Sequence, residues 1–148
     1  MKLSEILGQV ELFDGLGHDE LEQIAAICQE KSFRSGDVVT QQGDAGDELF
    51  VIWDGLVEVV HEETPHDPAP RTVVNLGHGQ VFGEMALVDY GPRSASIRVV
   101  SDAATVQAIH RDAFMRLCED HNHLGFVVMR NIAADLSFKL RHQHLVGR

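Results

Sequence analysis

The sequence predicts a domain built mainly of antiparallel β-strands, arranged as a barrel or a sandwich, with helices before and after them. At 148 residues the chain has the length of one ordinary domain. Its first 110 residues contain short β-rich runs together with 11 of the 13 glycines and all four prolines, which is the composition of many short elements joined by turns. The last 38 residues show helical spacing of apolar residues instead.

The N-terminal segment, residues 1–32, is expected to be helical. Between residues 19 and 28, the apolar side chains recur at helical spacing, and residues 15–17 (Gly-Leu-Gly) interrupt the chain before them. This pattern predicts a first helix over residues 19–28.

Residues 33–110 are expected to form the strands. β-rich runs occupy residues 38–39, 49–53, 56–60, 72–76, 97–100 and 105–109. Asp54-Gly55 lies between two of these runs and predicts a hairpin, because both central residues of such a turn need a positive φ. Residues 61–71 hold three of the four prolines and are predicted to be an exposed loop.

Residues 111–148 are expected to be helical again, with a short helix around Phe114 and a longer one over residues 124–140. Four apolar residues of the longer helix are spaced by 4, 3 and 4 positions and therefore share one face. Its members are Met129, Ala133, Leu136 and Leu140. This face either docks on the strands or meets another chain, and the sequence leaves both open.

The charge of the chain excludes several classes of partner. The formal net charge is −11, of which residues 1–110 carry −13. This acidity opposes binding to nucleic acid or to an anionic membrane surface. No apolar run approaches the ~20 residues that span a bilayer, the start lacks a secretory signal, and two cysteines make no disulfide framework. We therefore expect a cytoplasmic protein with no nucleic-acid partner and no membrane insertion.

The most informative stretch covers residues 83–96. Gly83 permits a close backbone approach, and residues 84–87 would form one helical turn whose free N–H groups attract an anion. Arg93, preceded by Pro92, suits bidentate recognition of a phosphate. Glu84 must then point at hydroxyl donors such as those of a ribose, because a carboxylate repels the phosphate. Phosphate and sugar hydroxyls together indicate a nucleotide.

Residues 82–87 and 92–95 resemble the phosphate-binding cassette of cyclic nucleotide-binding domains. The glycine-marked stretches 33–39, 43–52 and 54–59 are similar to the barrel strands of that family, in the same order. The resemblance implies one domain over residues 1–148, an eight-stranded jelly-roll-like antiparallel barrel flanked by helices, with the cassette at 82–96. It further implies that the last helix closes over the base as a lid.

The resemblance also implies residue roles. Arg93 would bind the cyclic phosphate, Glu84 would accept a hydrogen bond from the ribose 2′-hydroxyl, and the neighbouring residues would add backbone or hydroxyl donors. The expected ligand-binding residues are Gly83, Glu84, Met85, Ala86, Arg93, Ser94 and Ala95. The candidates for contact with the base are Asn131, Ser137 and Lys139 on the lid helix.

The function implied is that of a regulatory module, not an enzyme. Its expected ligand is 3′,5′-cAMP, with a cGMP-binding sensor as the alternative. It would signal occupancy by moving its C-terminal helices, with another chain or a second copy of itself as the effector. Because family members that regulate transcription carry a DNA-binding domain after the lid helix, the end of this chain at Arg148 predicts that such an output is missing.

Two alternatives belong to other classes. The first is a ligand-free interaction module that keeps the fold without the nucleotide. The second is a cupin-like metal enzyme, for which the histidine pairs 121/123 and 142/144 are the only ones spaced by two residues. Both pairs lie at or near predicted helix ends, where residues two apart diverge, so we expect no metal and no cofactor.

Overall fold

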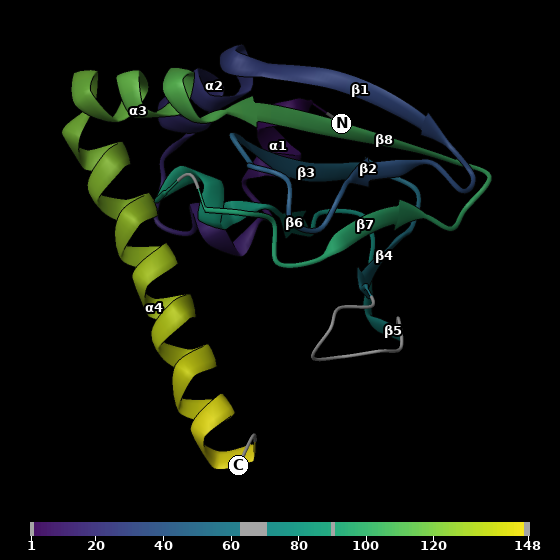
Figure 1. Ribbon diagram of the computed structural model, residues 1–148. Coiled ribbons are helices and arrows are strands. Elements are labelled where there is room, and N and C mark those ends of the chain that lie inside the picture. Colours follow the sequence, from purple (N-terminus) through teal and green to yellow (C-terminus); the bar gives the residue numbers. More distant parts are fainter. Residues whose placement is uncertain (1, 63–70, 90, 147–148) are drawn as a thin grey trace. The chain divides into compact units, whose positions relative to one another are not determined.

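The computed structural model describes residues 2–62, 71–89 and 91–146, and they form two compact units (Figure 1). The strand unit is Ile27–Phe114, and the helical unit combines Met1–Ala26 with Met115–Arg148. The expectation of a single domain over residues 1–148 stays a prediction.

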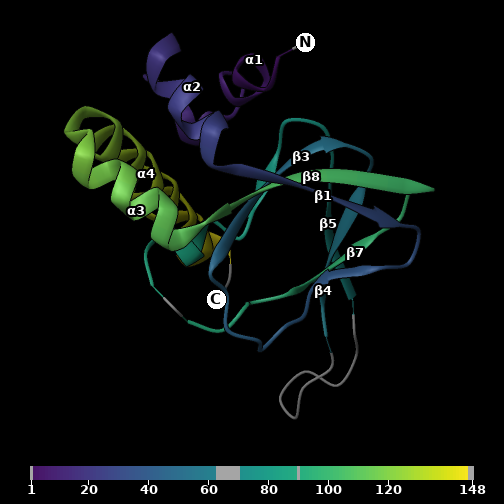
Figure 2. The ribbon, with the colours of Figure 1, turned by 90° about the horizontal axis from the view of Figure 1, so that it is seen from above.

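Eight antiparallel strands of the strand unit pair into two four-stranded sheets (Figure 2). The first sheet has the order β1-β8-β3-β6 and the second the order β2-β7-β4-β5. The strands are β1 (Cys28–Arg34), β2 (Val38–Thr40), β3 (Glu48–Asp54), β4 (Val57–His61), β5 (Arg71–Leu76), β6 (Val81–Phe82), β7 (Ser96–Val99) and β8 (Ala103–His110). The predicted antiparallel strands are thus confirmed. Their pairing within the described residues gives two sheets and does not by itself define a closed barrel.

Apolar side chains from both sheets form one core in the strand unit. On β3, Phe50 and Ile52 lie two residues apart and therefore point to the same side. They pack in a cluster with Val57, Phe82, Ile97, Val99, Ala104, Val106 and Ala108, all of them buried. At roughly 25 cal/mol for each Å² of apolar surface removed from water, such a core is the main stabilising contribution to the unit.

Strand β1 begins at Cys28, although residues 28–32 were expected to belong to the N-terminal helical segment. These residues are mostly polar and carry no apolar alternation that would indicate a strand. They are strand because they pair with β8, from Cys28 opposite Ile109 to Arg34 opposite Ala103. As an edge strand, β1 tolerates polar side chains that a central strand would bury.

The hairpin predicted at Asp54-Gly55 is wrong. Gly55 does adopt a positive φ of 98°, but the strands on either side of it belong to different sheets. Strand β3 pairs with β8 and β6, while β4 pairs with β7 and β5. The turn therefore carries the chain from one sheet to the other, and long-range pairing overrides the local hairpin signal.

The helices fall where the sequence predicts them, with additions at the N-terminus. They are α1 (Leu3–Leu7), η1 (Glu11–Phe13), α2 (His18–Ile27), α3 (Arg111–Asp120) and α4 (Asn122–Val146). No described helix combines the length and the apolar character needed to cross a membrane.

The most buried stripe of α4 is not the predicted one. It consists of Leu124, Val127, Val128 and Ile132. On the predicted face, Met129 and Leu136 are half-buried, Ala133 is exposed and Leu140 is 65% exposed. The predicted face of α4 therefore lies at the edge of the buried side of the helix and not at its centre.

The predicted loop at residues 61–71 is described only at its ends, where His61 of β4 and Arg71 of β5 are paired. Its central part, residues 63–70, and Tyr90 of the cassette lie outside the described residues.

Candidate functional site

Gly83 determines the backbone path of the cassette. It follows β6 and adopts a φ of +80°, a left-handed conformation that glycine reaches without strain. This turn starts the short 3₁₀ helix η2 (Glu84–Leu87). The first N–H groups of such a turn have no acceptor within it, so they are available to a ligand. Phe82, just before the turn, stacks on Phe50 with ring centroids 4.9 Å apart and anchors the turn to the core.

The backbone of Arg93 is held by the loop that connects β2 and β3. The Arg93 N–H donates to the Asp44 carbonyl at 2.7 Å, and the Arg93 carbonyl accepts from the Gly43 N–H at 2.9 Å. An isolated antiparallel bridge between Ala45 and Pro92 continues this pairing. The position of Arg93 is therefore set by a segment almost 50 residues earlier in the chain.

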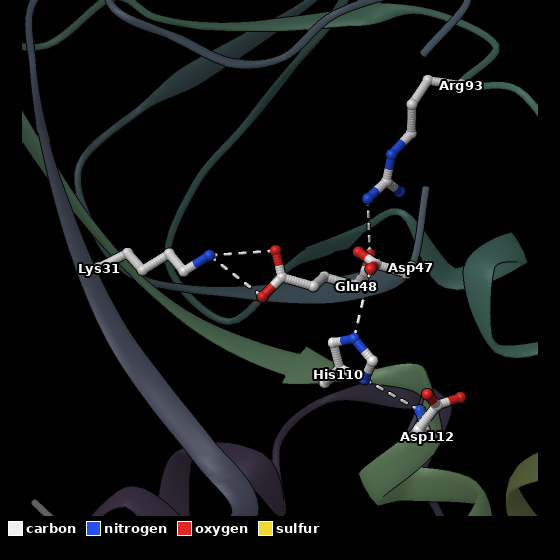
Figure 3. Close-up of polar contacts among 6 residues, drawn as sticks. All are labelled: Lys31, Asp47, Glu48, Arg93, His110 and Asp112. Carbon is white, nitrogen blue, oxygen red and sulfur yellow. Dashed lines mark hydrogen bonds and ion pairs between the residues drawn. The ribbon is translucent and has the colours of Figure 1, made fainter. Parts of the chain in front are cut away.

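The side chain of Arg93 turns toward β3, where Nη2 donates to the backbone carbonyl of Glu48 at 2.9 Å (Figure 3). Two glycines make room for the guanidinium. A Cβ atom on Gly83 would lie 2.6 Å from Nη1, and one on Gly46 would lie 2.5 Å from Cζ. The Arg93 Cζ atom also lies 5.7 Å from the centroid of the Phe50 ring, within the range of a cation–π contact.

The guanidinium of Arg93 keeps its charge without a carboxylate partner. Burial lowers the pKa of Arg93, and the charges of Asp47 and Glu48 act in the opposite direction. The group stays cationic because an arginine starts from so high a pKa. Within the described residues, no carboxylate forms an ion pair with Arg93.

The two carboxylates whose charges act on Arg93 are engaged elsewhere (Figure 3). The Glu48 carboxylate pairs with Lys31, at 3.0 and 3.1 Å from Nζ, while the Asp47 carboxylate lies 3.2 Å from His110 Nε2. The only side-chain hydrogen bond of Arg93 in the described part of the chain is thus to a neutral carbonyl. A half-buried cation held in this way is suited to binding an anion.

The structure brings together part of the predicted site. Gly83 and Arg93 are in direct proximity, and η2 contributes the half-buried Glu84, the 49% exposed Met85 and the buried Ala86. Ser94, which is exposed, and Ala95, which is half-buried, follow Arg93 just before β7. The ligand roles of these residues stay predictions.

Gly46 and Glu48 are the site residues that the sequence alone did not reveal. They act on Arg93 through the space that a missing Cβ leaves and through a backbone carbonyl. A carbonyl leaves no trace in residue type. Only Gly46 could have been noticed in the sequence, as one of the glycines that mark the stretch 43–52.

The three candidates for contact with the base all belong to the helical unit. There the Asn131 amide donates to the carbonyls of Leu12 and Asp14, both at 2.9 Å, and so ties α4 to the segment around η1. Lys139 forms an ion pair with Asp135 at 2.9 Å, and Ser137 is half-buried. Asn131 thus has a structural role in its own unit, and the base contacts stay predictions.

The described residues contain no group of three or more His, Cys, Asp and Glu side chains placed to hold a metal ion. Burial raises the pKa of the Cys28 thiol to about 12 and, with Glu119, that of the Cys118 thiol to about 11. Neither cysteine is therefore activated as a nucleophile.

Comparison with known proteins gives a consistent result. The cyclic nucleotide-binding domain family matches residues 30–121. The chain is 33% identical over 114 residues to cGMP-dependent protein kinase, isozyme 1, of Drosophila melanogaster, which covers 77% of this chain and 15% of the kinase. It is also 33% identical over 134 residues to the cyclic AMP receptor protein of Thermus thermophilus, which covers 90% of this chain and 59% of the receptor.

A solved structure agrees with these relatives. The regulatory domain of Toxoplasma gondii PKA, co-crystallised with cAMP, matches with a TM-score of 0.70 and 30% identity, over 78% of this chain and 42% of that chain. The two-sheet module of this chain is thus similar in sequence and in fold to domains of proteins whose names refer to cyclic nucleotides. The chain belongs to the cyclic nucleotide-binding domain family. It spans less than two thirds of the length of each of these relatives.

Proposed function

We propose that this protein is a regulatory module that binds a 3′,5′-cyclic nucleotide, with cAMP preferred to cGMP. Arg93 would bind the cyclic phosphate, and Glu84 would accept a hydrogen bond from the ribose 2′-hydroxyl. The module acts as a sensor and not as an enzyme. It reports occupancy through its C-terminal helices to another chain or to a second copy of itself, in the cytoplasm. The ligand lies in the jelly-roll-like barrel that the family resemblance implies.

One observation carries this proposal. The Arg93 guanidinium is half-buried and cationic, and its side chain bonds only to the Glu48 carbonyl within the described residues. Keeping a partly desolvated cation without an ion pair costs stability, so its retention indicates an anionic ligand. The adjacent η2 turn adds backbone N–H groups, whose partial positive charge also attracts an anion.

The acidity of the chain favours a cyclic phosphate over other nucleotides. Residues 1–110 carry a formal charge of −13. A singly charged cyclic phosphodiester is repelled less in this field than a more highly charged nucleotide.

The proposal is tested by thermal unfolding with cAMP, with cGMP and with 5′-AMP as control. At 100 times its dissociation constant a ligand adds about 2.7 kcal/mol, which corresponds to a rise in melting temperature of about 5–10 °C for a chain of this size. We expect this rise with cAMP, a smaller one with cGMP at equal concentration, and none with 5′-AMP. If neither cyclic nucleotide raises the melting temperature, the protein is the ligand-free interaction module.

The role of Glu84 is tested by Glu84→Gln. The amide accepts a hydroxyl hydrogen bond more weakly than the carboxylate does, so we expect cAMP affinity to fall by about tenfold. The affinity for 2′-deoxy-cAMP should change by less than about twofold, because that ligand lacks the hydroxyl. Calorimetric titration measures both dissociation constants. Equal losses for the two ligands would remove Glu84 from the ribose site.

A further inference from the structure

We propose that His110 is a positioning residue for the anion site, acting through Asp47 on the Glu48–Arg93 hydrogen bond and joining that site to the first turn of α3. The inference rests on the proposed function, since it names a residue that tunes the same site. All the residues involved belong to the strand unit.

The two nitrogens of the His110 ring make one polar contact each, with different partners (Figure 3). Its Nδ1 atom accepts from the backbone N–H of Asp112 at 3.1 Å, and its Nε2 atom lies 3.2 Å from Asp47 Oδ2. Because Nδ1 acts as an acceptor, it carries no proton. The N–H group of the neutral ring is therefore at Nε2, on the side of the Asp47 carboxylate. One side chain therefore caps the start of α3 and holds the Asp47 carboxylate.

Asp47 is held from a second side as well. Its carbonyl accepts from the backbone N–H of Arg111 at 2.7 Å. Its neighbour Glu48 lies directly opposite His110 in the β3–β8 ladder. The start of β3, which presents the Glu48 carbonyl to Arg93, is thus held by residues at the end of β8.

Asp47 also acts on Arg93 through space. Its negative charge raises the pKa of Arg93, so the carboxylate attracts the guanidinium even though the two form no ion pair. Without the His110 hydrogen bond the half-exposed Asp47 side chain would be free to turn, either into solvent or onto the guanidinium itself. An Asp47–Arg93 ion pair would compete with a phosphate for Arg93. The contact with His110 therefore keeps the Asp47 carboxylate off the guanidinium and leaves Arg93 available to a phosphate.

The experiment separates the two bonds of His110 with two matched variants. In His110→Asn the side-chain oxygen replaces Nδ1 and keeps the cap, since asparagine is a good N-cap residue, but no donor reaches Asp47. In His110→Gln the longer amide replaces Nε2 and keeps the bond to Asp47, while the cap is lost.

The expected result is a crossed pattern. His110→Asn should weaken cAMP binding about fivefold, the size that one lost hydrogen bond supports, and leave the melting temperature unchanged. His110→Gln should keep the affinity for cAMP within about twofold of the wild-type value. It should lower the melting temperature by about 3 °C, because the N-cap of α3 is lost. A merely structural role would move affinity and melting temperature together. Equal affinities of the two variants would overturn the proposal.

A second measurement does not depend on any nucleotide. The NMR signal of the Arg93 Nε–H group in the ligand-free protein should shift in His110→Asn and stay at its wild-type position in His110→Gln. If the wild-type protein binds no cyclic nucleotide, the proposed function fails and this signal still decides the role of His110. An unchanged Arg93 signal in His110→Asn would refute the positioning role.

Discussion

Arg93→Ala is expected to reduce cAMP affinity by at least about tenfold, and by up to several thousandfold, because removing one partner of a desolvated charge pair costs about 2–5 kcal/mol. The fold should survive, since the backbone bonds of Arg93 with Gly43 and Asp44 do not need its side chain. The side chain gives up one hydrogen bond to a carbonyl and its contact with Phe50. Calorimetric titration measures the affinity, and circular dichroism confirms that the variant is folded.

Arg98→Ala is the matched control for Arg93→Ala. Arg98 lies on β7, five residues further along the chain, and its Nε atom forms an ion pair with Glu58 at 3.1 Å. Its side chain is 46% exposed, and exposed pairs contribute about 0–1 kcal/mol. Both variants remove one positive charge, so the long-range field changes by the same amount. If Arg98→Ala weakens binding as much as Arg93→Ala does, the effect is one of net charge and Arg93 does not bind the phosphate directly.

Gly83→Ala is expected to lower both the stability of the protein and its affinity for cAMP. The left-handed φ of +80° strains any residue with a Cβ atom, at about 1–2 kcal/mol. The new Cβ atom would also lie 2.8 Å from the Glu48 carbonyl oxygen and 2.6 Å from Arg93 Nη1. Because a backbone oxygen cannot move away easily, overpacking adds about 1–3 kcal/mol. The unfolding free energy should therefore fall by about 2–5 kcal/mol in total, as measured by denaturant titration.

The affinity for cAMP should fall more than tenfold in Gly83→Ala, because the Arg93 guanidinium must leave its place. Gly79→Ala separates the conformational strain from the steric conflict. Gly79 has nearly the same φ, +81°, but a Cβ atom there meets nothing within 4 Å. This variant should lose only about 1–2 kcal/mol of stability and keep its affinity. Similar losses in the two variants would show that strain alone accounts for the effect and that Gly83 leaves no necessary space for Arg93.

The elements with strong local periodicity were predictable. Apolar alternation and spacing indicated most of the strands, and the helical repeat indicated α2 and α4. The polar strand β1 could not be predicted in this way, because its conformation comes from pairing with β8, whose residues lie about 70–80 positions further along the chain. The turn at Gly55 shows the same limit: its positive φ was local and predictable, whereas the choice of partners for β3 and β4 was not.

The candidate site divides in the same way. The residue types that recognise a phosphate and a sugar lie close together in one stretch, so Gly83, Glu84 and Arg93 could be recognised as a cassette from the sequence. The groups that position these residues could not be recognised from the sequence. Gly46, the Glu48 carbonyl and the Asp47–His110 bond come from distant segments, and one of them is a backbone atom.

The sequence by itself determined the family, most of the local elements and the residue types on which the proposed ligand chemistry rests, because each of these depends on residue types at short spacing. Only the tertiary structure decided that Arg93 has a carbonyl in place of a carboxylate as its partner, and that His110 holds Asp47. The physical reason is that hydrogen-bond partners depend on where β3, β8 and the cassette meet in space. The acidity that opposes binding to nucleic acid coexists with the half-buried cation Arg93. The two carboxylates whose charges act on Arg93 contact Lys31 and His110 instead.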